Sequence, residues 1–120
     1  MTLPRFAFRA RARRTQRKPG QMNRLETAYS AELELRRRAG DVLWFAWEAM
    51  KLRLADKTFL TPDFAVVNRD GEIEFHECKG FMEDDAAVKL KVAASMFPCR
   101  FLLVRARAKR DGGGFVVEEV

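Results

Sequence analysis

The chain has 120 residues, of which 48% are hydrophobic and 11% aromatic, and this is enough apolar material for one modest core but not for two. We therefore expect a single domain. No apolar run reaches transmembrane length, so we expect no membrane partner. The formal net charge of +6 is unevenly distributed, because residues 1–20 hold seven basic and no acidic residues, whereas the other 16 basic and 17 acidic residues nearly cancel.

Residues 1–20 are predicted to form a basic, flexible arm, and residues 21–120 a single domain. Pro19-Gly20 would act as the hinge between them. Because such an arm can neutralise phosphates, we expect it to lie along nucleic acid. A solubilising tail or an organelle transit peptide are the alternative interpretations. The arm residues predicted to contact nucleic acid are Arg9, Arg11, Arg13, Arg14, Arg17 and Lys18.

A helix is predicted from about Met22 to Ala39. Leu25, Tyr29 and Leu33 recur at four-residue spacing, which places them on one helix face, and Gly40 follows as a stop. We therefore expect this face to pack against the rest of the domain.

Three strands are predicted next, over Leu43–Leu54, Phe59–Val67 and Gly71–Lys79. The segments are rich in aromatic and branched residues, which favours strands. Together they predict a three-stranded meander in which the last two strands form a hairpin.

The turn of that hairpin is Asn68-Arg69-Asp70-Gly71. Asparagine favours the start of a type I turn, and glycine the left-handed position that follows. If the loop is Arg69-Asp70-Gly71 with a glycine bulge, Val67 lies opposite Ile73. The same register, continued along the ladder, sets Asp63 opposite Glu77.

Side chains alternate between the two faces of a strand, so Glu77 and Lys79 share a face, while His76 and Cys78 point to the other. The face of Glu77 is otherwise apolar and ends in Asp63, Glu77 and Lys79. A surface ion pair is the simplest alternative for these three residues. The interruption of an apolar face by two acids favours a functional cluster instead.

A second helix is predicted to open at Glu83-Asp84-Asp85, where acids are favourable, and to end before Pro98. Its expected buried stripe comprises Ala87, Leu90, Ala94 and Phe97. Phe101–Val104 is the strongest buried-strand signal in the chain. After a Gly112-Gly113-Gly114 loop, residues 115–119 are predicted to return as an edge strand.

Two adjacent carboxylates repel, unless a cation lies between them. Mg²⁺ accepts such hard oxygen ligands and keeps positions for water and phosphate, which suits Asp63, Glu77 and the backbone carbonyl of Cys78. Lys79 would orient the attacking water or stabilise charge on the phosphate. We expect Mn²⁺ to substitute for Mg²⁺.

Pro62-Asp63 followed by Glu77-Cys78-Lys79 resembles the PD-(D/E)XK nuclease superfamily, which includes restriction endonucleases and Holliday-junction resolvases. The stretch from Asn23 to Gly80 also resembles a small phage-encoded family of that superfamily. The resemblance implies an α/β fold with a restriction-endonuclease-like core, whose order is α-β-β-β-α-β-β and whose mixed sheet is flanked by two helices. It assigns metal binding to Asp63 and Glu77, and catalysis to Lys79.

The resemblance also places a catalytic and metal-binding acid at Glu26, on the first helix. Glu26 lies at the edge of the apolar stripe, where it can face the sheet. Asn23, three residues earlier, makes a capping box the alternative, in which Glu26 bonds backbone at the helix start.

The remaining polar residues carry weaker signals. His76, the only histidine, is predicted to be structural, and Cys78 to be core on the opposite sheet face. Two cysteines are too few for a structural zinc site and suggest reduced thiols. Lys89 and Lys91 of the second helix are expected to contact phosphate, or else to form a solvated helix face.

The sequence thus predicts a Mg²⁺-dependent deoxyribonuclease acting on DNA, with branched or otherwise structured DNA as the expected substrate. Cutting both strands would require a homodimer, whereas a monomer would nick one. No small-molecule cofactor is expected, and the predicted location is the cytoplasm of a bacterium or a phage-infected cell. The alternative is a non-catalytic nucleic-acid-binding module with a nuclease-like fold.

Overall fold

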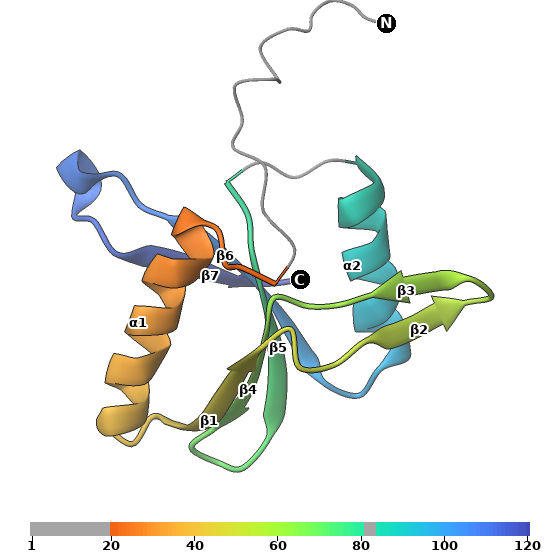
Figure 1. Ribbon diagram of the computed structural model, residues 1–120, viewed down its shortest axis with the longest axis horizontal. Helices are drawn as coiled ribbons and strands as arrows, with labels where there is room; N and C mark the ends of the chain where they lie inside the picture. Colours follow the sequence, from red (N-terminus) through yellow and green to blue (C-terminus); the bar gives the residue numbers. More distant parts are fainter. Residues whose placement is uncertain (1–19, 81–83) are drawn as a thin grey trace, which may run out of the picture.

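The computed structural model describes residues 20–80 and 84–120, which form an α/β fold with a mixed sheet and two helices (Figure 1). The elements in chain order are α1 (Arg24–Arg38), β1 (Val42–Trp47), β2 (Leu52–Ala55), β3 (Thr58–Leu60), β4 (Phe64–Asn68), β5 (Ile73–Cys78), α2 (Asp84–Met96), β6 (Arg100–Ala106), the 3₁₀ turn η2 (Lys109–Asp111) and β7 (Phe115–Glu119). Residues 1–19 of the predicted basic arm and Glu83 lie outside the described residues.

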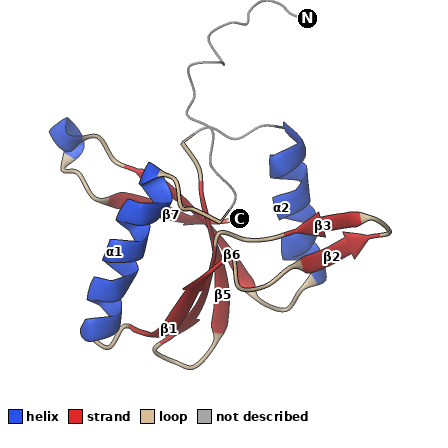
Figure 2. Cartoon of the chain, in the orientation of Figure 1, coloured by secondary structure: helices blue, strands red, loops and turns tan. Residues whose placement is uncertain are grey.

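The main sheet has five strands in the order β1-β4-β5-β6-β7 (Figure 1), and Figure 2 draws the strands in red. Strands β5 and β6 are parallel, and the other neighbouring pairs are antiparallel. A parallel pair needs a crossover connection, which α2 provides. Strand β7 lies at one edge, as the sequence predicted. The α/β class with a mixed sheet and two helices is therefore confirmed.

The prediction of three strands before the second helix was wrong, because the structure has five. The first predicted strand is interrupted after β1 at Glu48, which adopts a left-handed conformation with φ of 47°. The second is interrupted at Thr61-Pro62, since proline has no N–H to donate to a ladder. Strands β2 and β3 lie between the two breaks and pair with each other as a separate two-stranded sheet. We call β2 and β3 together the ribbon.

Helix α1 packs on one face of the main sheet. Tyr29 and Leu33 are fully buried and cluster with Phe64, Val66 and Cys78 of the sheet. The burial of Cys78 here confirms that it belongs to the core on the face opposite Glu77. The predicted stripe of α1 is confirmed as well, since Leu25 packs against this cluster.

Helix α2 packs on the opposite face. Leu90 and Ala93 are buried against Ala65, Phe75 and the β6 residues Phe101 and Leu103. The ribbon extends this core, because Leu54 of β2 is buried in the same cluster. Ala93 was absent from the predicted stripe, although its neighbours Leu90 and Ala94 were included in it. Within the described residues, no helix is long and apolar enough to cross a membrane.

Candidate functional site

The β4–β5 hairpin has the predicted register, with Val67 paired to Ile73 and Phe64 to His76. The Asn68 side chain fixes the turn by accepting hydrogen bonds from the backbone N–H groups of Asp70, at 2.9 Å, and Glu72, at 3.0 Å. Gly71 has φ of 83°, a conformation that favours glycine. The predicted turn chemistry is therefore confirmed.

The register brings Asp63 and Glu77 together where the ladder ends. The backbone N–H of Asp63 donates to Glu77 Oε1 at 3.0 Å, and the backbone N–H of Cys78 donates to Asp63 Oδ2 at 2.9 Å. The Glu77 carboxylate is thus held by the backbone just before β4, and the Asp63 carboxylate by the backbone at the end of β5. Both residues are only 7% exposed.

Lys79 continues the chain beyond β5. Its backbone N–H donates to the carbonyl of Val104 at 2.9 Å, which extends the contact with β6. Its ammonium Nζ lies 3.4 Å from Glu77 Oε2. The predicted trio of Asp63, Glu77 and Lys79 therefore lies together at one end of the β4–β5 hairpin.

The structure confirms the capping-box interpretation of Glu26, whereas its catalytic and metal-binding role stays a prediction. Glu26 forms the capping box, since its Oε1 accepts from the backbone N–H of Asn23 at 3.0 Å and its own N–H donates to Asn23 Oδ1 at 2.8 Å. Its side chain is nevertheless 2% exposed and lines the same pocket as Asp63. The cap fixes the side chain of Glu26 against the end of the hairpin.

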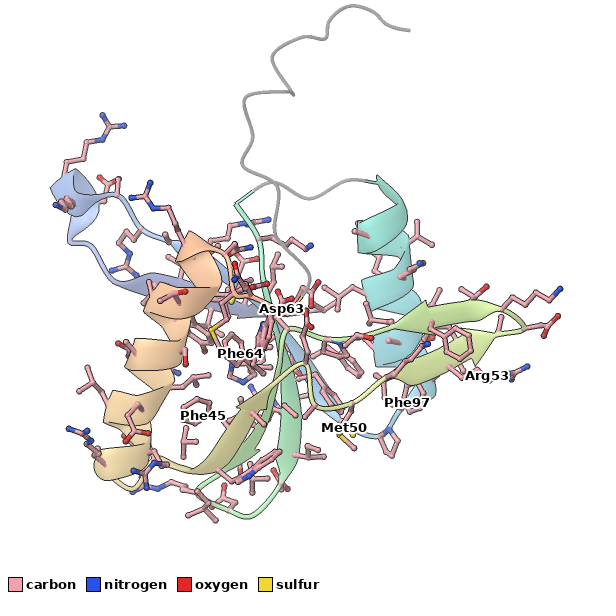
Figure 3. The ribbon with its side chains drawn as sticks, viewed as in Figure 1. Phe45, Met50, Arg53, Asp63, Phe64 and Phe97 are labelled. Atoms are coloured by element: carbon pink, nitrogen blue, oxygen red, sulfur yellow. The ribbon has the colours of Figure 1, made fainter. Side chains whose placement is uncertain are left out.

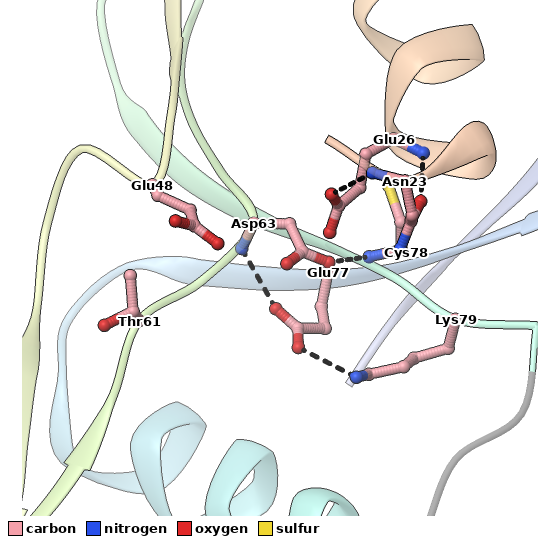
Figure 4. A pocket seen from close by; sticks show the side chains of 8 residues that line it. All are labelled: Asn23, Glu26, Glu48, Thr61, Asp63, Glu77, Cys78 and Lys79. Carbon is pink, nitrogen blue, oxygen red and sulfur yellow. Dashed lines mark hydrogen bonds and ion pairs between the residues drawn. The ribbon is translucent and has the colours of Figure 1, made fainter. Parts of the chain in front are cut away.

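The acids and Lys79 line a pocket of about 470 Å³ (Figure 4). Its walls come from the start of α1, the loop after β1, the segment before β4 and the end of β5. The lining residues are Asn23, Glu26, Glu48, Thr61, Asp63, Glu77, Cys78 and Lys79.

Sequence reasoning missed Glu48, which adds a fourth carboxylate to the pocket. Its backbone N–H donates to the carbonyl of Asp63 at 2.8 Å, so it is tied directly to the site. The apolar run around Glu48 predicts one long strand, and this pattern conceals the break. The sequence does contain a signal for this residue, because Glu48 is an acid inside an otherwise apolar run.

The electrostatics of the pocket favour a proton or a cation between the acids. Burial raises the pKa of Asp63 to about 8, and the nearby negative charge of Glu77 adds to the rise. Burial also raises the pKa of Glu77, although the Lys79 ammonium opposes this effect. Asp63 therefore keeps its proton at neutral pH in the absence of a bound cation.

The donor set fits a hard divalent metal, because it consists of carboxylate oxygens close to a backbone segment. Among the described residues, no three His, Cys, Asp or Glu side chains are arranged to hold a metal ion by themselves. Two carboxylates with one carbonyl and water ligands remain a complete set for Mg²⁺. The Cys78 carbonyl stays a prediction within that set.

His76 belongs to a buried network on the other sheet face, as its strand position predicted. Tyr29 Oη lies 2.7 Å from His76 Nδ1, and His76 Nε2 lies 2.9 Å from Glu74 Oε1. Burial lowers the pKa of His76, so the neutral ring accepts from Tyr29 and donates to Glu74. Burial favours protonation of Glu74, but hydrogen bonds from His76 and Asn68 outweigh it and lower its pKa.

Replacing Tyr29 with phenylalanine should destabilise the protein by about 1–2 kcal/mol, because the buried His76 Nδ1 loses its partner. Thermal or denaturant unfolding measures this loss. Ser30→Ala, on the same helix, is the control and should change stability by about 0.5 kcal/mol at most. Equal stability of Tyr29→Phe and the wild type would show that the hydrogen bond contributes nothing to folding.

Lys89 and Lys91 of α2 do not line this pocket. Lys91 is exposed and Lys89 is half-buried. The predicted phosphate contact of these two lysines stays a prediction, as does that of the arm.

In comparisons of the chain with protein-family models, curated proteins and solved structures, no match was found.

Proposed function

We propose that the protein is a metal-dependent endonuclease that hydrolyses phosphodiester bonds in DNA. The observation that carries this proposal is the contact between Asp63 and Glu77, two buried acids with raised pKa values, beside the ammonium of Lys79. Acids so arranged favour a divalent cation, and an ammonium beside them favours a phosphate. The resemblance of these residues to the PD-(D/E)XK nucleases supports the same assignment.

In this proposal, Asp63, Glu77 and the Cys78 carbonyl hold the metal, with Glu26 beside them. A bound Mg²⁺ would supply charge neutralisation at the phosphate and a water that ionises near neutral pH. The hydrogen bonds from the backbone to the Asp63 and Glu77 side chains fix both carboxylates before substrate arrives. Such fixed geometry lowers the reorganisation needed during reaction.

Lys79 acts on the substrate side of the pocket. Its ammonium, held by Glu77, can donate to a phosphate oxygen whose negative charge grows as water adds to phosphorus. The ester phosphorus–oxygen bond then breaks, which leaves a phosphate monoester on one fragment and a hydroxyl group on the other. The basic arm would contribute contacts to the DNA backbone from outside the pocket.

A substrate panel tests the proposal. We expect the purified protein to cleave DNA with Mg²⁺ or Mn²⁺, most rapidly on branched or partly single-stranded substrates, and a chelator to stop cleavage. Gel analysis of labelled single-stranded, duplex, flap and four-way-junction DNA measures this preference.

The protein with Asp63→Asn, prepared in the same way, is the control for a contaminating nuclease. Its activity should be lost on every substrate of the panel. Binding of DNA without metal-dependent cleavage would instead favour a non-catalytic nucleic-acid-binding module.

A further inference from the structure

The ribbon has two different faces. Leu52 and Leu60 pair across its strands and pack with the buried Leu54 towards α2. Because side chains alternate along a strand, the intervening residues Arg53 and Phe59 face away from this core. They lie directly opposite each other in the ribbon and are both exposed.

Phe59 lies exposed among cations on that outward face. The residue is 39% exposed, more than any other phenylalanine in the described part of the chain. Lys51 Nζ lies 4.5 Å from the centroid of its ring, and Arg53 is its cross-strand partner. We call Lys51, Arg53 and Phe59 the outward face of the ribbon.

The ribbon carries positive charge that the fold does not neutralise. Lys51, Arg53 and Lys57 form no salt bridge with any residue that the structure describes, and Asp56 is the only acid between them. An exposed aromatic ring flanked by unpaired cations fits the chemistry of a strand with exposed bases and phosphates. The surplus of positive charge favours a phosphate-bearing strand over a protein surface without net charge.

The ribbon also begins and ends at the candidate site. Glu48 precedes β2 and Thr61 follows β3, and both residues line the pocket. Phe59 is two residues from Thr61, which corresponds to roughly 7 Å along an extended chain. In Figure 3, Met50 and Arg53 lie on the segment that leaves the sheet, and Asp63 lies where the chain returns to it.

We propose that the outward face of the ribbon binds an unpaired DNA strand beside the cleaved phosphate. A base stacks on Phe59, and Lys51 and Arg53 contact the adjoining phosphates. This inference rests on the proposed nuclease function for its choice of DNA. It specifies the substrate further, because a fully paired duplex has no free base to place on Phe59.

Binding measured with a chelator present tests the inference independently of cleavage. Fluorescence anisotropy would compare a labelled single-stranded oligonucleotide with a blunt-ended, fully paired duplex of the same length made from two complementary strands, using the full chain. Phe59→Ala should weaken binding of the single strand about tenfold and binding of the duplex about twofold at most. Lys51→Gln and Arg53→Gln should each make the slope of log affinity against log salt concentration less steep for the single strand. The expected change in slope is about 0.7 for each phosphate that is no longer neutralised.

Leu43→Ala, at an exposed apolar residue of β1, and Arg69→Gln, in the β4–β5 turn, are the matched controls and should leave both affinities unchanged. Phe59→Leu keeps an apolar side chain on the ribbon but removes the aromatic face, so it should resemble Phe59→Ala. Full single-strand affinity of Phe59→Leu, or an equal loss on both substrates, would overturn the inference. Absence of cleavage by the wild type would refute the nuclease proposal without altering these affinities.

Discussion

Replacing Lys79 with alanine is expected to slow DNA cleavage by about 10²- to 10³-fold, because a positioned cation at the developing phosphate charge is removed. The affinity for DNA should change little, since one phosphate contact among several contributes modestly to binding. Single-turnover cleavage with Mg²⁺, together with binding in the presence of a chelator, separates the two effects. A loss confined to the cleavage rate identifies Lys79 as a catalytic residue.

Two variants sharpen this test. Lys109→Ala removes an exposed lysine of η2, far in sequence from the pocket, and should cleave at the wild-type rate. Glu77→Gln keeps the size of the side chain that holds Lys79 but removes a metal-binding charge, so cleavage should also be lost. If the Lys79→Ala protein cleaves as fast as the wild type, the activity in the preparation belongs to another nuclease or to another site.

The metal-free protein should become less stable as the pH rises from 6.5 to 8. The pKa of Asp63 is raised from 3.8 to about 8, so in this range the folded protein retains a proton that the unfolded chain has released. The free energy of unfolding then falls by up to about 1.4 kcal/mol per pH unit for this one group. The raised pKa of Glu77 acts in the same direction.

Raising the pH above 6.5 progressively removes the opposing contribution of His76. Its pKa is lowered by folding, so below 6.5 the unfolded chain binds the extra proton and stability rises with pH. As the pH rises above 6.5, the ring in the unfolded chain loses its proton, and the ring is then neutral in both states. The slope in this window therefore reports mainly on the acids of the pocket.

Asp63→Asn should flatten this slope and make the metal-free protein more stable than the wild type at pH 8. Chemical denaturation at several pH values, in the presence of a chelator, measures both effects. Asp111→Asn, at an exposed acid, should retain the wild-type slope. Stability of the wild type that is independent of pH between 6.5 and 8 would show that Asp63 is already ionised without metal.

Much of the hairpin that carries the candidate site was predictable from the sequence. The Asn68 and Gly71 turn fixes the loop length, and the loop length fixes which residues face each other. Period-two alternation then separates Glu77 from His76 and Cys78. These features are local, so a short stretch of sequence contains the information.

Other features of the site were not predictable in this way. The apolar stretches on either side of Glu48 and Pro62 resemble continuous strands, since β-propensity does not reveal which neighbour a strand will pair with. After β1 the chain leaves the main sheet, and β2 packs against α2 instead of continuing β1. The ribbon and the place of Glu48 in the pocket are both consequences of that split.

The sequence by itself determined the two helices, the β4–β5 register and the meeting of Asp63 with Glu77 and Lys79, because turn geometry and side-chain periodicity act over a few residues. Only the tertiary structure decided that Glu26 reaches the same pocket while it caps α1, that Glu48 joins it, and that the ribbon begins and ends there. These relations depend on how separate elements pack against one another, and packing is set by the whole core and not by any local segment.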